Sequence, residues 1–327
     1  MSCRAQIAAF VLGILYTLLL VPLVKRLAVA CRALDKPNAR KVHKDPIPLW
    51  GGLGIAGGYF LAMATVIALS SAFRQAVTET MVSQLIGMSL GGFLILIVGM
   101  IDDRYGMPAK VKLACQLVVG GIMFYFGIKI DYLTVPFYGV VFLETWQSAA
   151  LTLFWIAGIT NALNLLDGLD GLLAGVSLTV ASVFCVVSLL KGQFVIVLAM
   201  ACLAGCSLGF LRYNFNPAQI FMGDTGSLFF GLMFAGWSIV GLLKSTATFA
   251  FLLPIFLMAV PIFDTTFAIV RRLWAHQPIF KPDKGHLHHR LLGLGLSQRQ
   301  VVLIIYAINT LFGLCGLALF YWTCRGE

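Results

Sequence analysis

The sequence predicts an all-α protein that crosses a membrane about ten times and forms a single domain over residues 1–327. Its residues are 60% hydrophobic and only 11% charged, whereas soluble domains have about 45–50% apolar and about 25% charged residues. The mean hydropathy is +0.94, and the 33 glycines are typical of helices that pack closely in lipid. This composition excludes an ordinary soluble enzyme.

Ten uncharged apolar runs approach the length of about 17–25 residues that a membrane helix needs. The first run is followed by Lys25 and Arg26 and exceeds the core of about 7–15 residues of a signal peptide, so it predicts a helix rather than a leader. Alternating residues between Lys129 and Trp146 predict a short external hairpin. The ten expected spans are residues 5–24, 51–72, 83–101, 113–128, 149–166, 172–190, 194–211, 226–243, 248–270 and 301–322.

The basic residues predict the orientation of these spans. With both termini outside, 17 of the 23 Lys and Arg fall in the cytoplasmic loops, as positive-inside asymmetry requires. The net charge of +10 is therefore attributed to insertion, and no nucleic-acid partner is predicted. The loops that face the cytoplasm, and that carry the motifs below, are residues 25–50, 102–112, 164–171, 212–225 and 271–300.

Two motifs place carboxylates at the ends of predicted helices. In GMIDDRYG, Asp102 and Asp103 are adjacent, and two neighbouring carboxylates need a cation nearby. They indicate a base or a Mg²⁺ site, the alternative being a solvated helix end with Arg104 as partner. In NALNLLDGLDGLLAG, Asn161, Asn164 and Asp167 recur every three residues along one helical face. Asp170 follows between Gly168 and Gly171, so this turn holds more polar groups than turning requires.

Three further segments carry polar groups suited to a phosphate substrate. In NFNPAQIFMGDTGS, Asp224 precedes an apolar helix, where it is either an N-cap or a metal ligand beside a bound anion. The His cluster HLHHR at 286–290, with basic residues around it, favours a diphosphate over zinc. Lys44 lies in a basic loop that is either phosphate-binding or merely solvated.

These five segments, in this order, resemble the polyprenyl-phosphate N-acetylhexosamine-1-phosphate transferases. The resemblance runs from Asp35 to Gln300. The interrupted pattern His286-Leu287-His288-His289 resembles the WecA and TagO branch, which uses UDP-GlcNAc, rather than the MraY branch, which transfers phospho-MurNAc-pentapeptide.

The resemblance implies roles for individual residues. Asp224 and Asn164 match Mg²⁺ ligands, with Mn²⁺ as a substitute. Asp102 matches the group proposed to accept a proton from the lipid phosphate, with Asp103 beside it. The residues that match the nucleotide pocket are Asp167, Asp170, Asn214 and Phe221, the last as a stacking surface for uracil, with Asn161 as a further substrate-binding candidate. The residues that match phosphate and sugar contacts are Lys44, Arg272, His286, His288 and His289.

The implied reaction transfers N-acetylglucosamine 1-phosphate from UDP-GlcNAc to undecaprenyl phosphate in the bacterial inner membrane, at the cytoplasmic face. UMP is released, and the lipid product starts a surface glycan such as O-antigen or teichoic acid. A MurNAc-pentapeptide donor is the alternative, and an ion-coupled transporter is a remote one. A homodimer is left open. Asp264 lies inside an apolar run and is expected to pair with a polar neighbour in the bundle.

Overall fold

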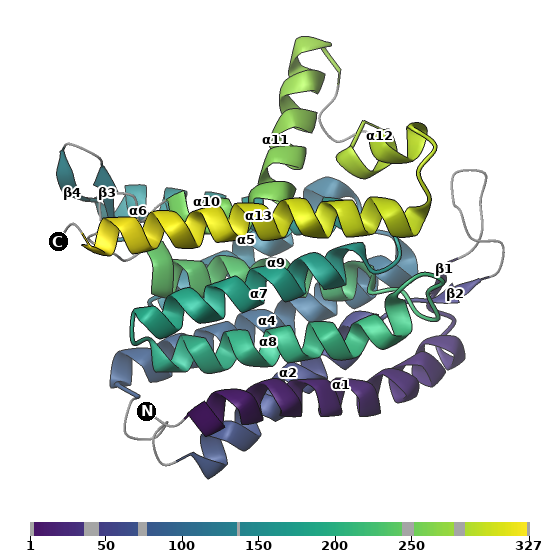
Figure 1. Cartoon of the computed structure of the whole chain (residues 1–327), viewed down its shortest axis with the longest axis horizontal. Helices are drawn as coiled ribbons and strands as arrows, with labels where there is room; N and C mark the ends of the chain where they lie inside the picture. The colour runs from purple at the N-terminus through teal and green to yellow at the C-terminus, as the bar shows by residue number, and fades with distance from the viewer. Residues whose placement is uncertain are drawn as a thin grey trace.

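The computed structural model describes residues 3–35, 46–70, 77–135, 138–243, 252–277 and 285–325. Most helices run lengthwise along one bundle, and two small hairpins lie at its opposite ends (Figure 1). The first half contains α1 (Cys3–Ala30), β1 (Leu34–Asp35), β2 (Ile47–Pro48), α2 (Gly51–Leu69), α4 (Glu79–Tyr105), α5 (Ala109–Tyr125), β3 (Tyr132–Val135) and β4 (Gly139–Phe142). The second half contains α6 (Thr145–Leu166), α7 (Leu172–Leu190), α8 (Phe194–Asn214), α9 (Gly223–Ser238), the π-helix η1 (Ile239–Leu243), α10 (Leu252–Leu257), α11 (Ala259–Trp274), α12 (Leu287–Gly293) and α13 (Gln298–Arg325).

Eight helices in the described part of the chain are long and apolar enough to cross a membrane, which confirms an all-α polytopic protein. The fourth and ninth predicted spans are not among these eight helices. The fourth is α5, of 17 residues. The ninth, residues 248–270, is divided at Met258 into α10 and α11. Pro261 explains the break, because its ring lacks an N–H for the carbonyl of Leu257 and clashes with it. After the break, α11 rises steeply away from the bundle (Figure 1).

Helix starts follow local capping chemistry. Thr78 precedes α4 and its hydroxyl accepts a hydrogen bond from the Met81 amide at 3.3 Å. Glu144 precedes α6 and forms a capping box with Gln147, whose side chain accepts from the Glu144 amide at 2.9 Å. Each satisfies amides that a helix start leaves without an internal partner.

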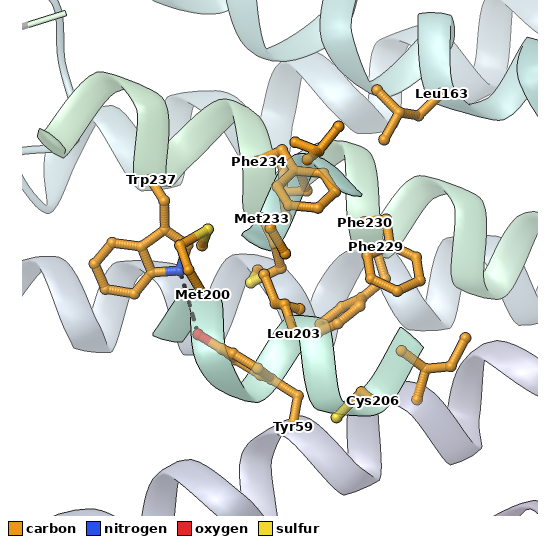
Figure 2. Close-up of a cluster of buried hydrophobic side chains, with 14 of the residues drawn as sticks. Tyr59, Leu163, Met200, Leu203, Cys206, Phe229, Phe230, Met233, Phe234 and Trp237 are labelled. Carbon is orange, nitrogen blue, oxygen red and sulfur yellow. Dashed lines mark hydrogen bonds between the residues drawn. The ribbon is translucent and has the colours of Figure 1, made fainter. Parts of the chain in front are cut away.

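The centre of the bundle is α9, which is buried along its apolar length. Its aromatic side chains pack against α8 and α2, and the Trp237 indole donates a hydrogen bond to the Tyr59 hydroxyl at 3.2 Å (Figure 2). The labelled members of this cluster are Tyr59, Leu163, Met200, Leu203, Cys206, Phe229, Phe230, Met233, Phe234 and Trp237. Burial of these large side chains fixes α9 against its neighbours.

Glycines bring two helices unusually close to the start of α9. A Cβ on Gly52 of α2 would lie 2.1 Å from the Gly226 nitrogen, and one on Gly99 of α4 would lie 2.4 Å from the Thr225 Cα. The first amides of α2 also donate hydrogen bonds to the two residues just before α9. Gly51 donates to the Phe221 carbonyl and Gly52 to the Met222 carbonyl, both at 3.0 Å. The starts of α2 and α9 and the end of α4 are therefore held together.

The predicted hairpin between Lys129 and Trp146 is confirmed as β3 and β4, which pair antiparallel from Tyr132–Phe142 to Val135–Gly139. It lies at the same end of the bundle as both termini, whereas β1, β2 and α12 lie at the other end (Figure 1). That second end carries the polar motifs.

Candidate active site

Four helices contribute side chains to one point at this end of the bundle. The ammonium group of Lys112 on α5 contacts both the Asp102 carboxylate at the end of α4 and the Asp224 carboxylate in the first turn of α9. Asn164, near the end of α6, donates from its amide to the other oxygen of Asp224 at 2.8 Å. We call Asp102, Asp103, Asp167 and Asp224, with Lys112 and Asn164, the carboxylate cluster.

The two adjacent aspartates have different partners. Asp103 accepts hydrogen bonds from the amides of Asp224 at 2.8 Å and Thr225 at 3.2 Å, and from the Thr225 hydroxyl at 2.6 Å. It therefore caps the start of α9 from a neighbouring helix. Asp102 accepts from the Met107 amide at 2.7 Å and presents its other oxygen to Lys112. Of the pair, Asp102 is the one that faces the cluster's cation.

Asp167 directly follows α6 and lies near the other acids. Burial, together with the charges of Asp224, Asp103 and Asp170, raises the pKa of Asp167 to about 8. Both the loss of hydration and like charge disfavour a further carboxylate here. The carboxylate cluster thus contains more carboxyl groups than the single charge of Lys112 can neutralise, as expected of a site that binds a further cation.

Three predicted binding residues serve as anchors within the fold. Asp170 accepts from the Asn216 amide group and the Ala218 amide, both at 3.0 Å. Asn214 accepts from the Gly171 amide and donates to the Ile220 carbonyl, also at 3.0 Å. Asn161 exchanges hydrogen bonds with Gln116 of α5. The first two join the turn before α7 to the loop before α9, and the third joins α5 to α6.

The histidine segment, residues 285–290, lies against that same turn. The ring of His288 packs so closely on Gly168 that a Cβ there would lie 2.5 Å from its Nε2 atom. The rings of His286 and His288 stack with their centres 5.9 Å apart, and the ring centre of His289 lies 4.3 Å from that of His288. The sequence-predicted His cluster therefore adjoins the turn that contains Asp167.

The remaining predicted residues have different outcomes. Phe221 is half-buried between β2 and α2, where its amide donates to the Pro48 carbonyl at 2.8 Å. Arg272 is half-buried near the end of α11. Lys44 lies outside the described residues.

The donor set of the cluster fits a hard divalent cation. Two carboxylate oxygens already converge on one ammonium group, and the side-chain amide of Asn164 lies beside them, with its nitrogen donating to Asp224. Within the described residues, no three Asp, Glu, His or Cys side chains are arranged to hold a metal by themselves. Mg²⁺ suits such a place, since it often takes one or two carboxylates and completes its shell with water and substrate phosphates.

Sequence reasoning does not single out Lys112. It reads as one more positive-inside residue beside Lys110, and its 16% exposed side chain becomes notable only through its contact with acids on α4 and α9. The sequence does hold one signal for it. Lys112 lies about one helical turn into α5, four residues before Gln116, so the two polar side chains share one face of that helix.

Comparisons with known proteins extend these observations. The model of glycosyl transferase family 4 matches residues 85–242. A Bacillus subtilis (strain 168) protein named "Probable undecaprenyl-phosphate N-acetylglucosaminyl 1-phosphate transferase" is 43% identical over 96% of this chain and 84% of its own length. A Mycobacterium tuberculosis protein named decaprenyl-phosphate N-acetylglucosaminephosphotransferase is 41% identical over 86% of this chain and 74% of its own. A Bacillus anthracis phospho-N-acetylmuramoyl-pentapeptide-transferase is 29% identical over 96% of each chain.

Proposed function

The chain belongs to glycosyl transferase family 4, and from this we propose that it transfers N-acetylglucosamine 1-phosphate from UDP-GlcNAc to undecaprenyl phosphate. An oxygen of the lipid phosphate attacks the β-phosphorus, the bond from that phosphorus to the bridging oxygen breaks, and UMP leaves. Relatives named for GlcNAc 1-phosphate transfer are 41–43% identical, against 29% for the pentapeptide transferase. This difference favours UDP-GlcNAc as the donor.

One observation carries the chemical part of the proposal: Asp102, Asp224 and Lys112 meet at a single point. Phosphoryl transfer needs the reacting groups to be positioned and their charge neutralised more than it needs covalent help. We propose Asp224 and Asn164 as the ligands of Mg²⁺, which when bound would neutralise charge on the diphosphate. Lys112 supplies a second cation at the same point.

Asp102 acts on the side of the lipid phosphate. A phosphate monoester with a second pKa of about 6 is already mostly ionised at pH 7. The task of Asp102 is therefore to orient the nucleophile, together with Lys112, rather than to remove a tightly held proton.

The proposed orientation puts this end of the bundle in the cytoplasm. It is supported by the excess of Lys and Arg in the loops at the motif end. Both chain termini then lie on the outer face of the bacterial inner membrane, and UDP-GlcNAc reaches the cluster from the side where nucleotide sugars are made.

Release of UMP tests the function directly. Purified protein in detergent, with undecaprenyl phosphate and Mg²⁺, is supplied with UDP-GlcNAc, other UDP-N-acetylhexosamines, UDP-glucose or UDP-MurNAc-pentapeptide in turn. We expect UMP and a lipid-linked product with UDP-GlcNAc at the highest rate. Comparable release from the pentapeptide donor would overturn the proposed donor, and the absence of release from every donor would overturn the proposed activity.

A further inference from the structure

Asp264 does not pair with a neighbour inside the bundle, as the sequence leads one to expect, but with the histidine segment. It lies on α11, and its Oδ2 atom is 2.8 Å from Nδ1 of His286. Its Oδ1 atom accepts a hydrogen bond from the Leu287 amide, also at 2.8 Å. Both side chains are only 7% exposed, so water competes little for these bonds.

A second residue of α11 holds the same segment. Arg271 donates from its guanidinium group to the Gly285 carbonyl at 2.9 Å. Arg271 is seven residues after Asp264, about two helical turns, and so lies on the same face of α11. Through these two side chains, α11 fixes the backbone immediately before and at the start of α12.

The histidines differ in what surrounds them. His288 is buried against Gly168, and its Nδ1 atom has no hydrogen-bond partner in the described part of the chain. Burial, followed by the nearby His289 and His286, lowers the pKa of His288 to about 4, which makes it neutral at pH 7. His286 instead faces the carboxylate of Asp264. The three histidines of the histidine segment are therefore not equivalent cations.

We propose that Asp264 is a positioning residue that holds the proton of His286 on Nδ1, so that Nε2 is the ring nitrogen presented to the diphosphate of the substrate. An ionised carboxylate can only accept hydrogen bonds, and the two donors that Asp264 meets favour its ionised form. Nδ1 must then carry a hydrogen, and when both ring nitrogens are protonated the Nε2–H can donate to a phosphate oxygen. The inference about substrate rests on the proposed function, whereas the pairing does not.

The state of His286 can be observed without turnover. The chain has five histidines, so protein labelled with ¹⁵N-histidine gives few imidazole signals, and those missing in His286→Gln belong to His286. We expect Nδ1 of His286 to be protonated in the wild type. In Asp264→Ala the neutral ring should change to the Nε2–H form. Unchanged His286 signals in Asp264→Ala would overturn the proposal.

A double-mutant cycle tests whether Asp264 acts through His286. Asp264→Ala and His286→Gln should each lower kcat/KM by about tenfold or more, and the double variant should be no worse than His286→Gln alone. Multiplication of the two effects would overturn the proposal, since Asp264 would then act independently of His286. Asp131→Ala is the matched control, because Asp131 pairs with Lys129 near the opposite hairpin, and it should keep wild-type activity.

The two measurements separate this inference from the function on which part of it rests. If wild-type protein releases no UMP, the proposed function fails, and the ¹⁵N spectra still decide whether Asp264 sets the tautomer of His286. If UMP is released and the spectra of wild type and Asp264→Ala agree, the function stands and the role of Asp264 fails.

Discussion

The carboxylate cluster and the histidine segment lie at the same end of the molecule but are supported in different ways. The cluster stands mainly on α4, α6 and α9, packed into the buried centre where Gly52 and Gly99 admit the backbone of α9. The histidine segment includes the start of the seven-residue α12 and is hydrogen-bonded to Asp264 and Arg271 of α11, a helix that extends away from the bundle (Figure 1). The carboxylates proposed to bind a cation are thus on closely packed helices, whereas the histidines proposed to contact the substrate lie on a short helix at the edge of the bundle.

The largest effect is expected within the carboxylate cluster. Asp224→Asn should lower turnover by at least about 10³-fold, because a neutral amide does not replace a charged metal ligand. Asp102→Asn should lower turnover less and leave UDP-GlcNAc binding largely intact. In Mg²⁺ titrations of UMP release, a high concentration should partly rescue Asp224→Asn but not Asp102→Asn. Equal rescue of both variants, or of neither, would contradict the division of roles.

Lys112→Met should have the next largest effect, lowering turnover while raising the apparent affinity for Mg²⁺. Turnover should fall roughly 10²–10³-fold, as when a positioned group that stabilises transition-state charge is removed. The Mg²⁺ concentration for half-maximal activity should also fall, because Asp102 and Asp224 lose the ammonium that they share. Lys110→Met, two residues away on α5, is the control. A weaker apparent Mg²⁺ affinity in Lys112→Met would indicate that Lys112 assists metal binding rather than competing with it.

The sequence alone predicts the all-α class and the location of the motifs at one end of the bundle, because hydropathy and charge patterns depend directly on the membrane. It was not sufficient for tasks set by tertiary contacts. Asp103 caps α9, which lies 121 residues further along the chain, and neither that partner nor the Asp264–His286 pair has a local signature. The break before α11 does have a local signature, since Pro261 lies within the predicted span of residues 248–270.

The packing that supports the cluster can be tested by adding a methyl group. Gly52→Ala should destabilise the protein by about 1–3 kcal/mol, because its Cβ would meet backbone atoms of α9 rather than a movable side chain. Gly158→Ala in α6 is the control, since nothing lies within 4 Å of the new atom. Thermal unfolding in detergent measures both. Equal midpoints would show that α2 can shift away from α9 without cost.

Asp167 predicts a pH dependence of stability. Its pKa of about 8 in the fold lies above the value of about 4 for an ordinary Asp, so between these pH values the unfolded chain binds fewer protons. Stability should therefore fall as pH rises from about 4 to about 8. In Asp167→Asn, measured without added metal by thermal unfolding at several pH values, this fall should be smaller and the midpoint at pH 7 higher. A midpoint at pH 7 below that of the wild type would contradict the raised pKa.

The smallest expected effect lies where the two regions touch. Gly168→Ala would place a methyl group 2.5 Å from the His288 ring, and a side chain on a short helix can move aside where the backbone of α9 cannot. The unfolding midpoint should therefore stay near that of the wild type, while kcat/KM for UDP-GlcNAc falls roughly threefold to tenfold, about 0.6–1.4 kcal/mol of transition-state stabilisation. Gly293→Ala, at the far end of α12 with nothing within 4 Å, should change neither. If Gly168→Ala instead lowered stability as much as Gly52→Ala, the histidine segment would be packed as rigidly as the carboxylate cluster, and the contrast between the two regions would not hold.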